Sequence, residues 1–322
     1  MAITFIRGLH NLPPPGEGVA ATIGTFDGVH RGHQAILARV RERASHLGVP
    51  ACAIIFEPHP REYFLGPRAP AKLMRLREKV EALDRLGIDR VLCLPFNERL
   101  RSMNPETFIE EVLVAGLGVR SLVVGDDFRF GRSGSGNAAL LRAAAARWGF
   151  EVLDTPTVYH QGRRISSTWV REALEAGDFD LAAALLGRRY GIGGRVMRGE
   201  ALGRRLGVPT ANVNLKRQRA PLSGVFVVEA VVEGRRFPAV ANVGVRPTLG
   251  GSDRPILEVH LLDWQGDLYG KRLWVEFLAR LRDEARFPDL ERLAAQIESD
   301  VRAARAFFAR RGSPGTADDG GA

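Results

Sequence analysis

The sequence predicts two different halves: a doubly wound parallel α/β sheet, then a β-barrel that ends in a helix. In the first half, short apolar runs alternate with stretches of helical periodicity, which is typical of βαβ repetition. After residue 190 the pattern changes to short β-type runs separated by Gly, Pro and Asn turns, and a closed or partly closed barrel is the simplest fold for so many short strands. The length of 322 residues suits two domains of ordinary size.

The first half is predicted from apolar runs that are long enough for buried strands. These runs cover residues 19–24, 51–56, 90–95 and 121–125. Helical patterns separate them: one places Ile36, Leu37, Val40, Ala44 and Leu47 on one face, and others cover 72–86, 105–116 and a stretch ending near Trp148. In such sheets, ligands bind beyond the carboxyl ends of the strands.

The second half begins after two short helical patterns at 167–176 and 178–186, and we place the domain boundary at residue 187, with the barrel domain at 188–309. The predicted barrel strands are 224–232, 236–243, 256–262 and 273–278. An apolar stripe predicts the terminal helix, and its members are Leu290, Leu293, Ile297, Val301 and Phe308. The small, polar, Gly-rich segment 310–322 is expected to be a disordered tail.

The composition is that of a globular protein, with 45% hydrophobic and 26% charged residues. No apolar run is long enough to span a bilayer, and the first residues lack the pattern of a signal peptide, so we expect a cytoplasmic protein with no membrane partner. Cys52 and Cys93 lie in apolar runs and are interpreted as buried hydrophobic residues, with a disulfide or a metal pair as the alternative.

The formal net charge is +9. The basic residues are spread along the whole chain, without the compact block or aromatic interleaving of a nucleic-acid interface, so we expect no nucleic-acid partner. A modest positive field suits polyphosphate substrates. The oligomeric state stays open, and a homo-oligomer is among the alternatives.

The segment 22–33, TIGTFDGVHRGH, lies where a predicted strand leads into a helix. Gly24 and Gly28 allow tight turns and a close approach of the backbone to a phosphate. His30 and His33 are three residues apart at the helix start, so they can share one face beside an N-terminus that favours anions. Two imidazoles there would stabilise the charge that develops on a phosphoryl group, whereas two ordinary histidines are the alternative for an isolated H-x-x-H.

This segment resembles the HxGH signature of the nucleotidyltransferase superfamily, and ISSTWVR at 165–171 resembles the second signature of that superfamily. Between them, FEPHP at 56–60 and GDDFRFG at 125–131 are similar to its flavin-adenylating branch. The resemblance implies that the phosphate of FMN attacks the α-phosphorus of ATP and pyrophosphate leaves. It also implies that Mg²⁺ assists and that no covalent enzyme intermediate forms.

The same resemblance implies roles for single residues. His30 and His33 would contact the transferring and leaving phosphates, while Arg171 reaches polyphosphate oxygens. The residues expected to bind substrate or nucleotide are Gly24, Phe26, Asp27, Gly28, Asp127, Ser166, Ser167 and Thr168. For 165–171 the alternative is a helix cap with a surface arginine. The loop 132–137 departs from the pattern of relatives, so its contacts are not implied.

The segment PTAN at 209–212 offers the Thr210 hydroxyl and the Asn212 amide oxygen, which are hard ligands suited to Mg²⁺, and a plain turn is the alternative. It belongs to a series of segments at 203–213, 241–248, 257–263, 267–273 and 281–287. In this order, they resemble riboflavin kinase over residues 191–307. The resemblance implies a riboflavin-kinase-like barrel in which the 5′-hydroxyl of riboflavin attacks the γ-phosphorus of ATP.

By that resemblance, Glu258 is the candidate base for the hydroxyl proton, and Thr210 and Asn212 are the candidate metal ligands. A carboxylate suits this task because phosphoryl transfer needs orientation and charge neutralisation more than strong deprotonation, whereas a strand-surface glutamate is the alternative. Further candidate binding residues are Gly203, Asn242 and Arg246.

We therefore expect a bifunctional riboflavin kinase and FMN adenylyltransferase that uses ATP and a divalent metal, with riboflavin, FMN and FAD as substrates or products. One alternative enzyme class transfers nucleotidyl groups to other acceptors, but such proteins are not expected to carry a PTAN barrel. A basic nucleic-acid-binding protein with an inactive nucleotide fold is the alternative outside enzymes, and a chain with only one active module is a third.

Overall fold

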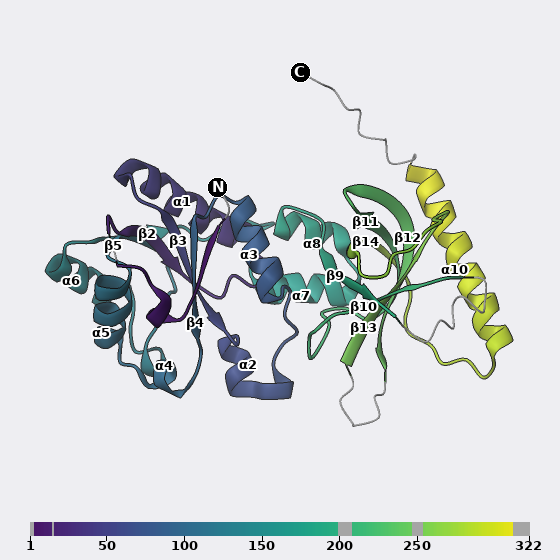
Figure 1. The fold of residues 1–322 in the computed structure, drawn as a ribbon, viewed down its shortest axis with the longest axis horizontal. Helices are drawn as coiled ribbons and strands as arrows, with labels where there is room; N and C mark the ends of the chain where they lie inside the picture. The colour runs from purple at the N-terminus through teal and green to yellow at the C-terminus, as the bar shows by residue number, and fades with distance from the viewer. Residues whose placement is uncertain (1–2, 15, 199–207, 247–253, 312–322) are drawn as a thin grey trace, which may run out of the picture. The chain divides into compact units, whose positions relative to one another are not determined.

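The computed structural model describes residues 3–14, 16–198, 208–246 and 254–311. The described chain forms two compact units, which divide between Trp169 and Val170 (Figure 1). The predicted boundary at residue 187 remains a prediction. The tail residues 312–322 and Gly203 lie outside the described residues, and so does the side chain of Arg246.

The first unit contains a six-stranded sheet in the order β1-β4-β3-β2-β5-β6, in which every pairing is parallel. Its strands are β1 (Thr4–Arg7), β2 (Val19–Ile23), β3 (Ala51–Glu57), β4 (Arg90–Pro95), β5 (Val119–Gly125) and β6 (Glu151–Thr155). Every residue of β2 is buried, as expected for a central strand covered on both faces. The predicted parallel sheet is confirmed.

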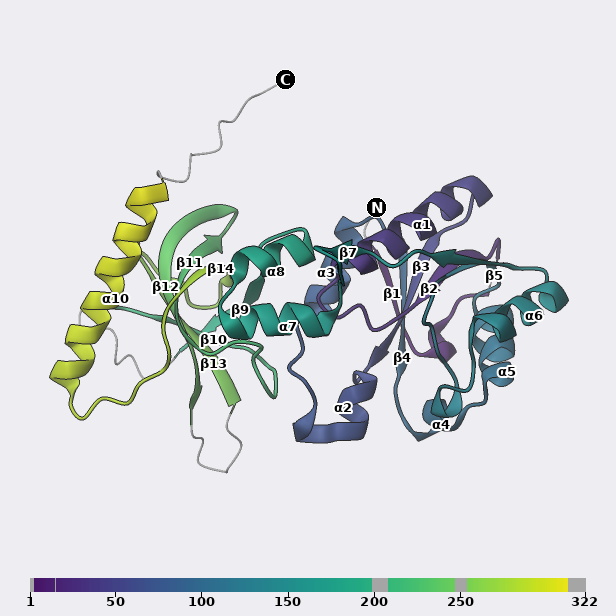
Figure 2. The same ribbon diagram turned by 180° about the vertical axis from the view of Figure 1, so that it is seen from behind.

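Helices cover both faces of this sheet (Figure 1 and, from behind, Figure 2). The helices are α1 (Arg31–Leu47), α2 (Pro60–Leu65), α3 (Leu76–Arg85), α4 (Glu98–Ser102), α5 (Pro105–Phe108), the π-helix η3 (Ile109–Gly116) and α6 (Ala138–Trp148). One apolar cluster joins α1 and α3 to the sheet through Leu37 and Leu83. The other joins α5, η3 and α6 to it through Phe108, Val112 and Leu141.

Short elements complete this unit. They are η1 (Leu9–Asn11), η2 (Gly66–Arg68), η4 (Arg132–Gly134) and a hairpin of β7 (Tyr159–His160) and β8 (Arg163–Arg164). The helix predicted over 72–86 begins only at Leu76, because residues before it are used in tertiary hydrogen bonds: the N–H groups of Leu73 and Met74 donate to Asp27.

The second unit contains a closed antiparallel barrel in the order β10-β13-β12-β11-β14-β9. Its strands are β9 (Gly191–Met197), β10 (Ala211–Asn214), β11 (Gly224–Val232), β12 (Arg235–Arg246), β13 (Arg254–Leu261) and β14 (Arg272–Arg282). Helix α7 (Ser167–Ala176) crosses the division between the units. The helix α8 (Phe179–Leu186) contacts the barrel through Phe179, whose ring lies 5.8 Å from that of Phe226.

The predicted terminal helix is confirmed as α10 (Leu290–Arg311). Its residues Ala304 and Phe308 are buried in one cluster with Val225 and Val240 of the barrel. The guanidinium of Arg282 fastens the same helix, because it donates to both carboxylate oxygens of Asp300 at 2.9–3.1 Å.

Cys52 and Cys93 are free and buried, which confirms the prediction that they are interior hydrophobic residues. Burial raises the pKa of the Cys52 thiol to about 12. Within the ranges that the structure describes, no helix has both the length and the apolar character to cross a membrane.

Candidate active sites

The first candidate site lies at the carboxyl end of β2, where the chain turns into α1. Three residues of the turn have positive φ angles: Phe26 at 47°, Gly28 at 84° and Val29 at 44°. Such angles are costly for residues with side chains, so the surrounding structure must hold this turn in place. The turn ends at His30, whose Nδ1 accepts a hydrogen bond from the backbone N–H of His33 at 3.3 Å and thereby caps α1.

The imidazole rings of His30 and His33 are stacked, with centroids 3.7 Å apart and planes at 15°. Gly32 leaves room for this arrangement, because a Cβ there would lie 3.2 Å from the ring of His30. Since Nδ1 of His30 accepts, its Nε2 carries the proton.

His33 is uncharged near neutral pH. Burial lowers its pKa well below the ordinary value, and the neighbouring His30 and Lys79 lower it further. Its Nδ1 is buried and has no hydrogen-bond partner in the described part of the chain. The pair therefore presents neutral imidazoles beside the N-terminus of α1, which is an arrangement suited to a phosphate.

Asp27 holds the turn to two distant segments. Its carboxylate accepts from the N–H groups of Leu73 at 3.1 Å and Met74 at 3.0 Å. Its carbonyl oxygen accepts from the Ser167 hydroxyl at 2.8 Å. Asp27 and Phe26 are buried, each with 1% of its surface exposed. Contact of either residue with the substrate remains a prediction.

The two signature segments of this unit lie next to each other. Besides the Ser167 contact, the carbonyl oxygen of Ile165 lies 3.8 Å from the position of a Cβ on Gly32. Ser166 accepts from the N–H of Trp169 at 3.2 Å, and Thr168 is exposed. Arg171 belongs to the second compact unit, and its contact with polyphosphate remains a prediction.

Asp127 is held by an arginine that sequence reasoning missed. The guanidinium of Arg164 lies 2.7 Å from its carboxylate and lowers its pKa. A second contact from the hairpin side joins the Thr157 hydroxyl to Asp126 at 2.6 Å. These contacts fasten the loop after β5, while Phe128 stacks on Phe130 at 5.5 Å.

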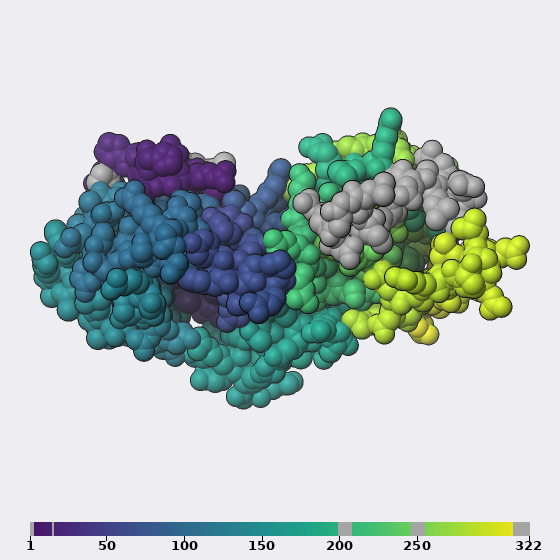
Figure 3. Space-filling view, turned by 90° about the horizontal axis from the view of Figure 1, so that it is seen from below, coloured from purple at the N-terminus to yellow at the C-terminus, as the bar shows by residue number. Residues whose placement is uncertain are grey.

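A partly exposed aromatic surface lies at the carboxyl ends of β3 and β4, and sequence reasoning missed it as well. The ring of Phe96 lies 6.0 Å from Phe56, 5.4 Å from Tyr63 and 5.7 Å from Phe64. Phe64 is 58% exposed, and α2 has no buried residue. Residues of this region lie at the surface of the first unit in the space-filling view (Figure 3). An exposed aromatic group of this kind suits the flat face of a conjugated ligand.

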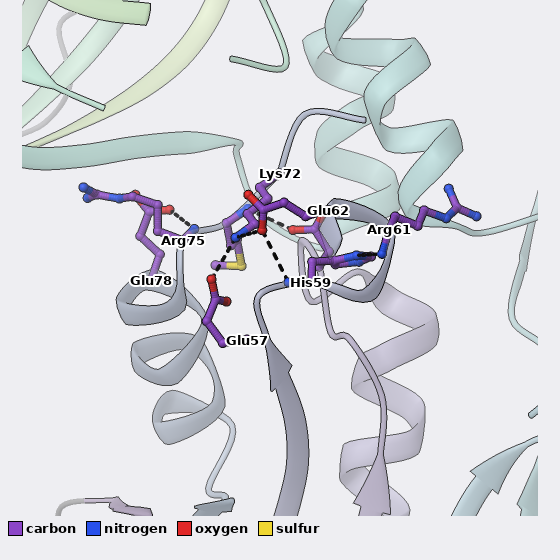
Figure 4. A network of polar contacts seen from close by, with 9 residues as sticks. Glu57, His59, Arg61, Glu62, Lys72, Arg75 and Glu78 are labelled. Carbon is purple, nitrogen blue, oxygen red and sulfur yellow. Dashed lines mark hydrogen bonds and ion pairs between the residues drawn. The ribbon is translucent and has the colours of Figure 1, made fainter. Parts of the chain in front are cut away.

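Ion pairs fix α2 beside this surface, and Figure 4 shows them. The ammonium of Lys72 lies 2.9 Å from Glu57 at the end of β3 and 2.5 Å from Glu62 of α2. Burial acts to lower the pKa of Lys72, but the bonds to Glu62 and Glu57 outweigh it and raise the pKa. His59 and Glu62 also form a capping box at the start of α2.

The second candidate site is a cavity of about 220 Å³ in the barrel unit. The predicted residues that line it are Thr210, Asn212, Asn242 and Glu258. The strand register explains why they meet: Glu258 of β13 lies opposite Asn212 of β10 on one side and opposite Asn242 of β12 on the other. An apolar wall comes from Phe287 and from Leu293, Ile297 and Val301 of α10.

Asn212 carries an unused acceptor in this cavity. The residue is 7% exposed, and its side-chain oxygen has no hydrogen-bond partner among the described residues. A buried acceptor without a donor is costly unless a ligand supplies the partner, and a cation meets that need.

The donor set fits Mg²⁺. Thr210 and Asn212 line the cavity and offer a hydroxyl and an amide oxygen as candidate ligands. Mg²⁺ usually keeps several waters and is held by few protein oxygens together with substrate phosphates, so two neutral oxygens are compatible with it.

A parallel α/β unit with a histidine pair at the N-terminus of α1, followed in the chain by a barrel with an oxygen-lined cavity, fits a two-domain nucleotide-dependent transferase. Comparison with known proteins makes the class specific. The family model for FAD synthetase matches residues 13–169, and that for riboflavin kinase matches residues 186–308.

Whole-length relatives agree. The bifunctional riboflavin kinase/FMN adenylyltransferase of Pseudomonas fluorescens is 56% identical, with 95% of this chain and 98% of the relative covered. The protein of the same name from Escherichia coli K12 is 47% identical, with coverage of 94% and 97%. A solved Streptococcus pneumoniae structure, named a macrolide-efflux protein, is similar with a TM-score of 0.78, 28% identity and coverage of 95% and 99%.

The chain belongs to the bifunctional riboflavin kinase/FMN adenylyltransferase family. This confirms the predicted family and the prediction of an enzyme with a kinase and a nucleotidyltransferase activity.

Proposed function

We propose that the barrel cavity phosphorylates riboflavin to FMN and that the histidine pair of the first unit transfers AMP from ATP to FMN, forming FAD and pyrophosphate. The meeting of Glu258, Asn212 and Asn242 in one cavity carries the assignment of the kinase site. The stacked His30 and His33 beside the helix N-terminus support the adenylyl-transfer site.

In the kinase step, Glu258 accepts the proton of the 5′-hydroxyl as its oxygen attacks the γ-phosphorus of ATP. The bond from the γ-phosphorus to the bridging oxygen breaks, and ADP leaves. Thr210 and Asn212 would hold Mg²⁺, which would neutralise phosphate charge when bound. Asn242 lies opposite Glu258 in the strand register, so the two side chains are on the same face of the sheet.

In the adenylyl-transfer step, a phosphate oxygen of FMN attacks the α-phosphorus of ATP. The Nε2–H of His30 donates to a phosphate oxygen, and the N-terminus of α1 adds its partial positive charge. Because His33 is neutral, it binds phosphate oxygen as a hydrogen-bond donor rather than as a cation. Ser167 and Thr168 supply hydroxyls, and Arg171 supplies charge to the departing pyrophosphate.

The aromatic surface formed by Phe56, Tyr63, Phe64 and Phe96 provides a support for the isoalloxazine ring of FMN in this step. Its place beyond the carboxyl ends of β3 and β4 supports this, because β3 is the neighbour of β2 in the sheet and β2 leads to His30.

The test is a time course with purified protein, riboflavin, ATP and Mg²⁺, in which chromatography separates the flavins. We expect FMN to rise first and FAD to follow. Accumulation of FMN alone would refute the assignment of His30 and His33. Absence of conversion, while a relative with known activity converts riboflavin in parallel, would refute both site assignments.

A further inference from the structure

Glu284 lines the barrel cavity but has no role in the proposed phosphoryl transfer. It follows β14 in the segment that leads to α10, and it lines the cavity together with Glu258. Its carboxylate lies directly against Gly244 of β12, where a Cβ would be 1.9 Å from Oε1. The missing side chain of Gly244 therefore leaves the space that this carboxylate fills.

The carboxylate of Glu284 has no ion pair or hydrogen bond with the described residues. Arg282, two residues before Glu284, donates to Asp300 at 2.9–3.1 Å and to the carbonyl oxygen of Asp283 at 3.0 Å. Burial raises the pKa of Glu284, and Glu258 raises it further, while Arg282 opposes them. Although Glu284 is exposed to solvent, its carboxylate lines a ligand cavity beside Glu258, where it can accept a hydrogen bond from a bound ligand.

The position of Gly244 in the strand register shows how far Glu284 lies from the candidate base, Glu258. Asn242 lies opposite Glu258, and Gly244 is two residues further along the same face of β12. Two residues along a strand span roughly 7 Å. If the terminal hydroxyl of an acceptor alcohol lies at Glu258, a hydroxyl further along a short polyol chain comes within reach of Glu284.

The surroundings of Glu284 favour an alcohol over a metal ion as its partner. The segment continues through Ala285 and Phe287 into the apolar wall made by Leu293, Ile297 and Val301 of α10. The candidate metal ligands, Thr210 and Asn212, come instead from β10 and the turn before it, and β13 separates β10 from β12 in the barrel.

We propose that Glu284 determines specificity for the polyol chain: its carboxylate accepts a hydrogen bond from an internal hydroxyl of the acceptor flavin and thereby aligns the terminal hydroxyl with Glu258. The inference rests on the proposed kinase site. It adds a binding contact to that site and leaves the chemical step with Glu258.

The first experiment compares Glu284→Ala with the matched control Glu298→Ala, which removes an exposed glutamate of α10. For Glu284→Ala, we expect the Kd and KM of riboflavin to rise roughly 10- to 100-fold, as for loss of a hydrogen bond to a charged group. The KM of ATP and the Mg²⁺ concentration for half-maximal rate should stay unchanged, and Glu298→Ala should change none of them. An unchanged Kd for riboflavin, or a raised Mg²⁺ requirement, would overturn the proposal.

A flavin without the polyol identifies the group that Glu284 contacts. Lumiflavin carries a methyl group in place of the ribityl chain, and its binding can be followed by fluorescence. We expect Glu284→Ala to weaken binding of riboflavin but not of lumiflavin. Equal weakening of both would assign the contact to the ring and refute the assignment to the polyol.

Gly244→Ala tests the contact between Gly244 and the Glu284 carboxylate without removing any polar group. Its Cβ should displace the carboxylate and raise the KM of riboflavin in the wild-type background, yet add nothing in the Glu284→Ala background. Independent, additive effects of the two substitutions would contradict the proposal. FMN-to-FAD conversion by each variant reports that the first unit is folded, and an unchanged KM of ATP in the kinase reaction reports that the barrel is folded. Glu258→Gln reports on the proposed kinase site separately, since full activity of that variant would place the kinase site elsewhere.

Discussion

The first unit offers hydrogen-bond donors at the end of β2, whereas the cavity of the barrel offers oxygen acceptors. At the first site, neutral imidazoles and the N-terminus of α1 can meet an anionic phosphate directly. In the barrel, Asn212 and Glu258 line the cavity with oxygen atoms, so under the proposed function a phosphate would enter together with a cation. The two proposed sites thus differ in how they would bind ATP, one through donors of the protein and one through a metal ion.

The largest effect is expected from the proposed base of the barrel. Glu258→Gln removes the proton acceptor but keeps the shape, and general-base catalysis is worth about 10²- to 10⁴-fold. We expect FMN formation to slow by such a factor, measured as riboflavin turnover, while FAD formation from added FMN continues at the wild-type rate. Loss of both activities would indicate that the two sites are not independent.

The reciprocal change is His30→Asn at the first site. Asparagine is a good N-cap, so α1 keeps its cap while the imidazole donor is lost. We expect adenylyl transfer to fall about 10²- to 10³-fold, measured with FMN and ATP, and the kinase step to be unchanged. The control is His46→Asn at the exposed far end of α1, and an equal loss in that variant would assign the effect to the helix rather than to the site.

A smaller effect is expected on stability, from the ion pair that attaches α10, the wall of the barrel cavity, to β14. Asp300→Ala removes the carboxylate that pairs with the Arg282 guanidinium between β14 and α10 and leaves it, among the described residues, only the carbonyl oxygen of Asp283 as an acceptor. We expect a loss of about 2 kcal/mol in unfolding free energy, below the range for fully buried pairs because Arg282 is 22% exposed. Urea unfolding measures it, with the exposed pair Asp263–Arg305 as control, where Asp263→Asn should change stability little.

The smallest effect is expected from the thiols, which neither site uses. Thiolate is the reactive form, and burial raises the pKa values of Cys52 and Cys93. Brief treatment with iodoacetamide at pH 8 should leave both thiols unmodified by mass spectrometry and both activities intact, whereas unfolded chain should be labelled. Rapid labelling of native protein would show that the first unit opens readily.

Local patterns were sufficient to predict the framework and the order of the motifs. Strands β2 to β5 coincide with apolar runs, and α10 coincides with an apolar stripe of helical period. The sequence alone was therefore enough to predict these elements. The edge strands β1 and β6 were missed because short, partly exposed strands lack such a pattern.

Contacts between distant residues could not be predicted in this way. The hydrogen bonds from Leu73 and Met74 to Asp27, and the seat of Glu284 on Gly244, depend on how the chain folds back on itself. The exposed aromatic rings of α2 were missed because the helix is short, although the aromatic pair Tyr63 and Phe64 after FEPHP was a signal that could have indicated them.

The closed barrel and the open sheet also differ in how they meet other chains. A closed ring of strands leaves no row of free backbone N–H and C=O groups, whereas the described sheet ends at β1 and β6. Strand addition between molecules, as in domain exchange or aggregation, thus has its starting points in the adenylyl-transfer unit. β1 is a short strand of four residues, three of them exposed, and its terminal Arg7 places a charge where a foreign strand would align.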